Sequence, residues 1–259
     1  MSERGSFDAV SVTRAGGREV NEDYVDVFHT ADASCWVIAD GLGGHRGGAI
    51  ASKLVVESAL RSFQEQPQVA AEQVERHCEQ AQEALLAAQR SDASLAQMRS
   101  TIVVLVANDR EAVWGHVGDT RLYHLRGERV VSRTRDHSVS QALVDGGQID
   151  QRQQGVHEDR SRLLRSLGKD GEPARPTIAG PVALCRDDAF LLCTDGFWEY
   201  VDESTMLSSL SHESTAAGWL REMVDDVVRR GGREQDNFSA LAVFCRDAAP
   251  EDADATKVV

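Results

Sequence analysis

The sequence predicts an α+β fold in which antiparallel strands are grouped apart from paired helices. Two observations support this prediction. Strand-like segments come in runs joined by short turns, and helical patterns come in pairs instead of following each strand. A doubly wound parallel sheet requires a crossover between successive strands and is therefore disfavoured. No repeat or linker divides the 259 residues, so we expect one large domain.

Three strands are expected before the first helix. Residues 8–13 and 23–28 alternate with a period of two, and residues 35–40 form a short apolar run that ends in Asp-Gly. From about residue 48 the apolar residues take the spacing of a helix face, and the same spacing returns over 70–88. This change of period predicts a helical pair.

The second half of the chain begins with four strand-like segments joined by short turns, from which we expect one antiparallel meander: 100–107, 112–118, 121–127 and 129–133. Residues 137–160 have weak periodicity and predict short helices and loops that form a mobile flap. The remaining expected elements are a strand within 187–196, a helix over 215–230 that stops at Gly231, a strand over 237–244 and a disordered tail from Ala248.

The composition disfavours several classes of partner. The chain has 28 basic and 42 acidic residues, which gives a formal net charge of −14. Repulsion between like charges disfavours nucleic acid and anionic membranes as partners. The apolar runs are shorter than the roughly 20 residues that a membrane-spanning helix needs, and the first residues lack the apolar core of a secretory signal. We therefore expect a cytoplasmic protein without membrane insertion.

The five cysteines are an odd number at wide spacing, without a C-x-x-C pair. This arrangement argues against both a zinc site and a disulfide framework. We expect buried free thiols at all five positions: Cys35, Cys78, Cys185, Cys193 and Cys245.

Carboxylates gather at the ends and starts of five expected strands: Glu22, Asp23, Asp40, Asp119, Asp195 and Asp236. In an antiparallel sheet, the ends of some strands and the starts of others share one edge, so these acids could meet there. Clustered carboxylates raise one another's pKa unless cations compensate. An all-oxygen site suits Mg²⁺, Mn²⁺ or Ca²⁺. Each Asp-Gly pair could instead be only a turn, but the whole set favours a metal site.

The glycines after Asp40 do not fit a nucleotide-binding loop. Arg46 stands where a dinucleotide fingerprint needs its third glycine, and no Gly-Lys-Ser/Thr follows. Glycines do let the backbone turn sharply and bring the Gly41 carbonyl close to a cation. Arg18 is five residues before Asp23 and has a planar guanidinium suited to phosphate. The alternative for Arg18 is a solvated surface residue.

Six short motifs follow one another along the chain: REVNED (18–23), DGLGGH (40–45), GDTR (118–121), RDHS (135–138), TDG (194–196) and QDNFS (235–239). In order and spacing, the sequence over about 6–246 resembles the metal-dependent protein phosphatases of type 2C. The resemblance implies a four-layer α-β-β-α sandwich of two antiparallel sheets flanked by helical pairs. It also implies a catalytic domain over 1–247 with a flap at about 137–168, followed by an acidic tail over 248–259.

The activity implied by the resemblance is hydrolysis of phosphoserine and phosphothreonine in proteins, with two Mn²⁺ or Mg²⁺ ions activating a water. Asp40 would bridge the two ions. Asp195 and Asp236 would complete the ligands of the first ion, and the Gly41 carbonyl would serve the second. The implied partners are phosphoproteins and an opposing Ser/Thr kinase, and we expect a monomer.

The resemblance assigns four further residues. Asp23 and Glu22 match the acidic pair that holds waters of the second ion. Asp119 matches a ligand of a third, weaker metal that Asp195 shares. Arg18 matches the arginine that binds the substrate phosphate.

Position 42 departs from the family pattern, because animal-type members carry a histidine there as a candidate general acid and this chain has Leu42. His45 is expected to be a turn or helix-start residue, and His137 of RDHS a structural residue near the flap. Phe197 and Trp198 are expected to begin a helix beside the site. Their FWE continuation resembles bacterial phosphatases associated with type VI secretion, which oppose a threonine kinase.

The sequence leaves three alternative functions open. An inactive phosphoprotein-binding module on the same fold would require a damaged ligand set, whereas all the matched acids are present. A dedicated stress-regulator phosphatase would usually carry a sensor domain. A small-molecule phosphodiesterase would also use two hard cations.

Overall fold

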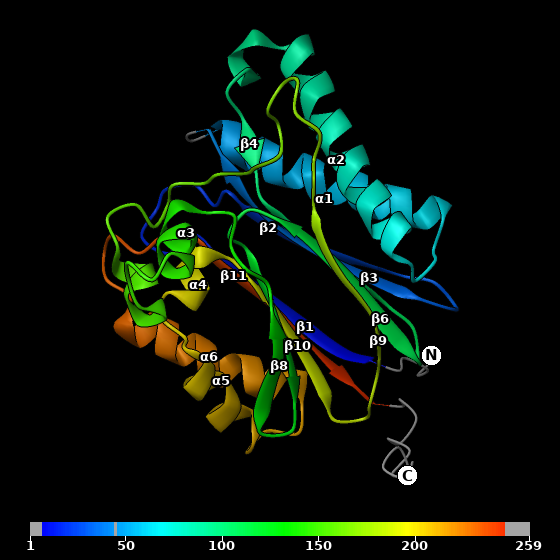
Figure 1. Cartoon of the computed structure of the whole chain (residues 1–259), viewed down its shortest axis with the longest axis vertical. Coiled ribbons are helices and arrows are strands. Elements are labelled where there is room, and N and C mark those ends of the chain that lie inside the picture. Colours follow the sequence, from blue (N-terminus) through cyan, green and yellow to red (C-terminus); the bar gives the residue numbers. More distant parts are fainter. Residues whose placement is uncertain (1–6, 44–45, 247–259) are drawn as a thin grey trace.

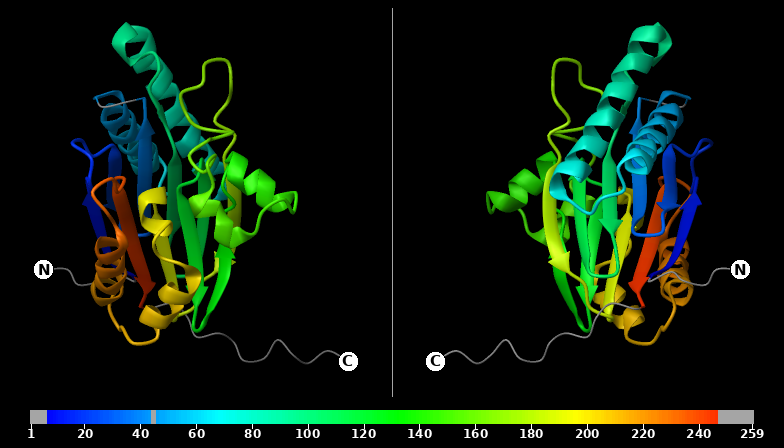
Figure 2. Two further views of the ribbon diagram at one scale, coloured as in Figure 1. Left: turned by 90° about the vertical axis from the view of Figure 1, so that its left-hand side faces the viewer. Right: turned by 90° about the vertical axis from the view of Figure 1, so that its right-hand side faces the viewer.

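The computed structural model describes residues 7–43 and 46–246, which form two antiparallel sheets packed face to face with helices on both outer faces (Figures 1 and 2). The predicted α+β class and the four-layer sandwich are confirmed. His45 and the tail over 248–259 lie outside the described residues, so the expectations for them stay predictions. In the part of the chain that is described, no helix combines the length and the apolar character needed to cross a membrane.

The first sheet has five strands in the order β1-β11-β10-β7-β8. They are β1 (Phe7–Arg14), β7 (Arg121–Arg126), β8 (Arg129–Arg133), β10 (Asp188–Cys193) and β11 (Phe238–Cys245). All residues of β10 and β11 are buried, because these strands lie inside the sheet and are covered on both faces. Their continuous apolar sequences reflect this position.

The second sheet has the order β2-β3-β5-β6-β9, with β4 paired to β3. Its strands are β2 (Asp23–His29), β3 (Ser34–Leu42), β4 (Arg99–Ser100), β5 (Ile102–Ala107), β6 (Glu111–Val117) and β9 (Thr177–Ala183). Strand β9 is not among the expected elements. It is a half-exposed edge strand with a proline at position 181, and an edge tolerates the missing N–H donor.

The prediction of one meander is wrong. Strands β5 and β6 pair in the second sheet, whereas β7 and β8 pair in the first. The chain crosses between the sheets at Gly118, which has a φ of +106° and whose missing Cβ would lie 2.6 Å from a methyl of Thr101. Turn residues predict hairpins but do not say which sheet each hairpin joins. The crossing carries Asp119 to the junction between the sheets.

Helices α1 (Arg46–Glu65) and α2 (Ala71–Ser91) cover the second sheet. Helices α4 (Asp195–Trp198), α5 (Glu203–Leu210) and α6 (Ala216–Arg230) cover the first. The Thr215 hydroxyl accepts the Gly218 N–H at the start of α6, and basic residues occupy its last turn before Gly231. The predicted helix over 215–230 is therefore confirmed, whereas α5 was not expected.

Short helices α3 (Val139–Asp145) and η2 (Gln151–Val156) lie in the connection between β8 and β9, and the 3-10 turn η1 (Ala93–Leu95) follows α2. The expected character of this connection is confirmed. Its mobility and its bounds as a flap, 137–168, remain predictions.

Three apolar clusters hold the four layers together. One lies between the α1/α2 pair and the second sheet, one lies between the two sheets, and one lies between the first sheet and α4–α6. Large side chains such as Trp36 and Phe190 fill the middle cluster, and full burial of each stabilises the fold by about 1.5–3 kcal/mol. None of the five cysteines, all of which lie in the described residues, forms a disulfide; Cys185 is half-buried and the other four are buried, so the prediction of burial is wrong for Cys185.

Candidate metal centre

Acidic side chains from both sheets meet at one end of the sandwich. Asp23 at the start of β2 is the direct cross-strand partner of Asp40 in β3. Asp119 follows β6, Asp195 is the first residue of α4, and Asp236 lies two residues before β11. Asp40 experiences electrostatic repulsion from each of the other four. The structure therefore brings together the aspartates that the sequence singled out.

Burial and mutual repulsion favour the neutral forms of four of these carboxyls: Asp23, Asp40, Asp119 and Asp195. Desolvation, with smaller contributions from Asp195 and Asp236, raises the pKa of Asp23 to about 7, although the Thr194 hydroxyl donates a hydrogen bond of 2.9 Å to it. Desolvation, followed by repulsion from Asp236, raises the pKa of Asp195 to about 6. Desolvation and repulsion from neighbouring aspartates also raise the pKa values of Asp40 and Asp119 well above the ordinary range. A divalent cation placed among them would relieve the repulsion.

The donor set fits Mg²⁺ or Mn²⁺ in its chemistry, because it consists of carboxylate and carbonyl oxygens. As the side chains of the described residues stand, no three His, Cys, Asp or Glu form a ready coordination shell. Asp236 pairs with Arg18, and Asp195 Oδ1 accepts the Gly196 N–H at 2.7 Å. Binding of an ion therefore requires these side chains to turn toward it.

Two glycines allow the backbone of β3 and the start of α1 to touch. A Cβ on Gly41 would lie 1.9 Å from the Gly48 carbonyl oxygen. A Cβ on Gly48 would lie 2.3 Å from Glu22 Oε1 and 2.7 Å from the Gly41 carbonyl oxygen. The Gly41 carbonyl and the Glu22 carboxylate thus approach each other beside Gly48. Leu42, the last residue of β3, pairs with Arg99 of β4.

Asn237 holds the loop that carries Arg18 and Glu22, and sequence reasoning missed it. Its Oδ1 accepts the Glu22 N–H at 2.8 Å, and its Nδ2 donates to the carbonyls of Ala15 and Val20, both at 2.9 Å. The available signal was its place in QDNFS, directly after Asp236. The Asp40 N–H likewise donates at 2.8 Å to the hydroxyl of Thr101, which the sequence analysis also did not single out.

Arg18 lies at the solvent-facing edge of the acidic group. Its Nη2 donates to Asp236 Oδ2 at 3.0 Å, and its side chain is 56% exposed. A half-exposed ion pair of this kind contributes little to stability. The guanidinium is therefore free to exchange its carboxylate partner for another anion.

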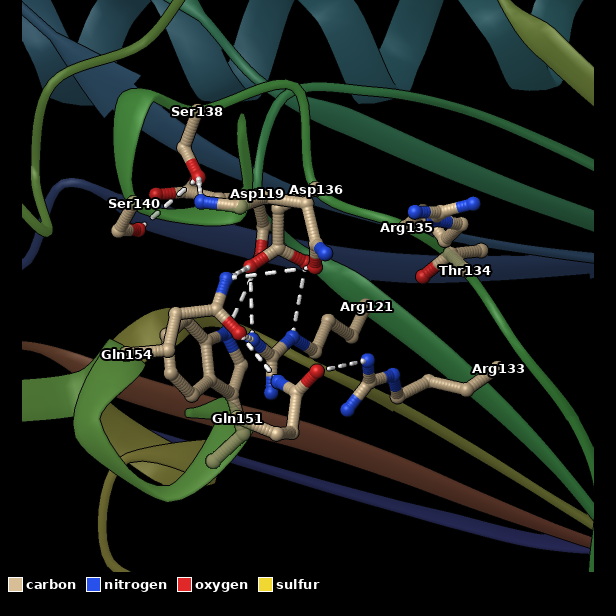
Figure 3. A network of polar contacts seen from close by, with 12 residues as sticks. Asp119, Arg121, Arg133, Thr134, Arg135, Asp136, Ser138, Ser140, Gln151 and Gln154 are labelled. Carbon is tan, nitrogen blue, oxygen red and sulfur yellow. Dashed lines mark hydrogen bonds and ion pairs between the residues drawn. The ribbon is translucent and has the colours of Figure 1, made fainter. Parts of the chain in front are cut away.

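A buried polar network lies beside Asp119 (Figure 3). The Trp198 indole N–H donates to the Asp119 carbonyl at 3.0 Å, and the Arg121 guanidinium lies 3.5 Å from the centre of the Trp198 ring. Arg121 also donates to both oxygens of Asp136, at 2.8 and 2.7 Å. Phe197 and Trp198 both lie in α4 and are buried, as expected of a helix start beside the site.

His137 joins the same region to β9. Its Nδ1 accepts the Gly118 N–H at 3.2 Å, and its Nε2 lies 2.9 Å from Thr177 Oγ1. Its ring stacks on His116 with 4.5 Å between centroids. Burial, with repulsion from His116, lowers the pKa of His137 to about 3, so the ring is neutral. These contacts agree with the expected structural role.

Comparison with known proteins gives consistent results. The sequence model of the protein phosphatase 2C family matches residues 13–237. The serine/threonine phosphatase Stp of Listeria monocytogenes serotype 4b (strain F2365) is 30% identical over 245 residues, which are 92% of this chain and 95% of that protein.

Two solved structures extend the comparison. The Mycobacterium tuberculosis serine/threonine phosphatase PstP/Ppp superposes with a TM-score of 0.79 at 26% identity, covering 93% of this chain and 99% of that one. PppA, described as a key regulatory component of T6SS in Pseudomonas aeruginosa, superposes with a TM-score of 0.69 at 30% identity, covering 92% and 97%.

Proposed function

The chain belongs to the protein phosphatase 2C family, and on this premise we propose that it hydrolyses phosphoserine and phosphothreonine in proteins at a binuclear Mn²⁺ or Mg²⁺ centre. One observation carries the proposal: buried and half-buried aspartates from both sheets repel one another at one place, with Arg18 beside them. Such a set is costly without cations and suits a phosphate ester when cations are bound.

The first ion would be held by Asp40, Asp195 and Asp236. Asp40 would also reach the second ion, together with the Gly41 carbonyl. When bound, the two cations supply an activated water and positive charge opposite the phosphate oxygens.

Other residues of the chain shape this site. Asp23 and Glu22 would accept hydrogen bonds from waters around the second ion, and Asn237 fixes the loop from which Glu22 projects. Asp119 would join Asp195 at a third, weaker ion. Arg18 would leave Asp236 and bind two oxygens of the substrate phosphate through its planar fork. Because water is the nucleophile, no serine or cysteine of the chain has to form a phosphoenzyme.

The physiological setting is a finer part of the proposal. We propose that a Ser/Thr kinase opposes this phosphatase, and that the pair acts in the control of type VI secretion. The support is the FWE continuation after Asp195-Gly196 and the 30% identity to PppA. We further propose a monomer in the cytoplasm, acting on phosphoproteins and not on nucleic acid, consistent with the formal charge of −14.

A chelation assay tests the activity. Purified protein should release phosphate from a phosphothreonine peptide in the presence of Mn²⁺ and stop when EDTA is in excess. Excess Mn²⁺ added back should restore the rate, which separates metal loss from unfolding. A rate that EDTA leaves unchanged would contradict a metal-dependent reaction.

A further inference from the structure

The four-residue helix α4 joins two parts of the site through one side chain. It begins with Asp195 and ends with Trp198, a residue that is 7% exposed. The indole N–H is bonded to the Asp119 carbonyl, and the ring face carries the Arg121 guanidinium. Trp198 therefore contacts the main chain at Asp119 directly and is in turn held in place by Arg121.

Arg121 is a rigid support for that ring. Arg121 and Asp136 form a bidentate ion pair, and their side chains are only 5% and 1% exposed. Arg121 also donates to the Tyr123 hydroxyl at 3.0 Å. If the Arg121 guanidinium moved away from Asp136, both buried charges would be left without compensation, which is costly. The guanidinium therefore has little freedom to move unless Asp136 or its remaining partners move with it.

Gln154 connects this pair to the segment between β8 and β9. It lies in η2 and is 1% exposed; its Nε2 donates to Asp136 Oδ2 at 2.7 Å, and its Oε1 accepts from Arg121 at 3.0 Å (Figure 3). Both ends of the Gln154 amide are thus bonded to the same ion pair. A displacement of η2 must break these two hydrogen bonds or shift Arg121.

Two further contacts join η2 to the first sheet and its helices: Arg133 of β8 donates to Gln151 Oε1 at 3.0 Å, and Gly155 faces Trp198, whose ring would lie 3.5 Å from a Cβ at that position. A cavity of about 580 Å³ is lined by residues of η2, including Val156, and by residues of the α4–α5 region, including Trp198 and Tyr200. Val156 at the end of η2 is 81% exposed. The segment that follows η2 is also linked to the α4 region, because Arg160 donates a hydrogen bond of 3.0 Å to Glu199, the residue directly after α4.

We propose that Trp198 is a positioning residue that couples the docking of η2, meaning its packing against the first sheet, to metal binding at Asp119. The contacts that carry this coupling run from Gln154 through the Arg121–Asp136 ion pair to Trp198. The proposal rests on the proposed function only in taking Asp119 and Asp195 as metal ligands. Asp119 and Asp195, if both held the same ion, would keep Trp198 and Arg121 in the arrangement to which Gln154 is bonded. Metal binding thereby stabilises the docked η2, and docked η2 strengthens metal binding.

Hydrogen exchange on the full-length protein tests this coupling. Exchange in residues 151–156 is measured with EDTA and with saturating Mn²⁺ for the wild type, Trp198→Phe, Gln154→Ala and Trp219→Phe. Trp219→Phe is the matched control, because its indole N–H also donates to a buried backbone carbonyl, that of Met206, at 3.0 Å. This bond lies in the α5–α6 region, away from η2.

We expect Mn²⁺ to slow exchange of η2 in the wild type and in Trp219→Phe, and to leave it unchanged in Trp198→Phe and Gln154→Ala. Calorimetric titration should show Mn²⁺ affinity about tenfold weaker in Trp198→Phe, as is typical when a group that supports a metal ligand is lost. Thermal unfolding checks that each variant is folded, and Gln154→Ala keeps the test decisive if Trp198→Phe does not fold.

Three results would overturn the coupling: no Mn²⁺ effect on η2 exchange in the wild type, an undiminished effect in Trp198→Phe and Gln154→Ala, or an equal loss in Trp219→Phe. Failure of the proposed function looks different. A wild type that binds Mn²⁺ and protects η2 but does not hydrolyse a phosphothreonine peptide would refute the activity and support the coupling.

Discussion

Replacement of Asp23 by asparagine should change how the stability of the metal-free protein depends on pH. Asp23 is 6% exposed, and burial followed by repulsion from Asp195 and Asp236 raises the pKa of its carboxyl from 3.8 to about 7. In the unfolded chain the group ionises near 3.8. As the pH rises through the interval between these two values, ionisation therefore favours the unfolded state.

The size of this loss of stability follows from the difference between the folded and unfolded pKa values of Asp23. A difference of about 3 pH units corresponds to about 4 kcal/mol of unfolding free energy. This loss is absent below about pH 4, grows up to about pH 7 and is constant above it. Asparagine has no proton to lose, so the stability of Asp23→Asn relative to the wild type should rise by up to about 4 kcal/mol across this range.

The difference between the two proteins isolates this effect from the histidines. Burial lowers the pKa values of His77 and His137 to about 4 and about 3. A lowered histidine pKa stabilises the fold above about pH 6.5, and this stability is lost as the pH falls. Because both histidines are present in both proteins, their contributions cancel in the comparison.

The assay is urea unfolding in EDTA from pH 4 to pH 8. Asp188→Asn is the matched control: burial raises the pKa of Asp188, but hydrogen bonds from His124 and Arg126 more than offset this and lower it overall. Its own ionisation is complete above about pH 4 in both the folded and the unfolded state, so the control should be less stable than the wild type at every pH of this range. With saturating Mn²⁺, Asp23→Asn should instead be the less stable protein. A difference in EDTA that does not change with pH would refute the reasoning.

Two further substitutions test individual side chains. Arg18→Ala should raise KM for a phosphothreonine peptide about tenfold or more, since hydrogen bonds to a charged group are lost; loss of Mn²⁺ binding in calorimetry would contradict its assignment to phosphate. Gly48→Ala should weaken Mn²⁺ binding about tenfold, because its Cβ would displace Glu22 Oε1 and the Gly41 carbonyl. Gly47→Ala is the control, since among the described residues its Cβ would meet only the Met98 side chain, at 3.7 Å; equal losses in both variants would refute the steric argument.

The sequence predicted strands whose side chains face one core and helices with a clear apolar face, because burial imposes a regular period on them. Strand β9 was not predicted, since a half-exposed edge strand with Gly180 and Pro181 has neither the period nor the usual residues of a strand. Helix α5 is only eight residues long. The assignment of β5–β6 and β7–β8 to different sheets depends on long-range packing and leaves no local pattern.

The candidate site likewise contains residues that could be predicted from the sequence and residues that could not. Its aspartates could be predicted because charged residues at the ends of apolar strands are unusual and fit one chemistry. Asn237, Thr101 and Thr194 could not, because neutral polar residues beside a strand are common and their hydrogen bonds join segments far apart in the sequence. Trp198 was expected near the site, but its bond to the Asp119 carbonyl follows only from the crossing between the sheets.

The most direct test of the central claim is phosphate release from a phosphothreonine peptide by Asp40→Asn in saturating Mn²⁺. Asp40 is the proposed bridge between the two ions, and the substitution changes one oxygen to an amide nitrogen with little change in volume. The account predicts less than about a tenth of the wild-type rate, a loss of more than about 1.4 kcal/mol in transition-state stabilisation, in a variant that unfolds cooperatively. A folded Asp40→Asn that kept more than about a tenth of the rate would contradict it.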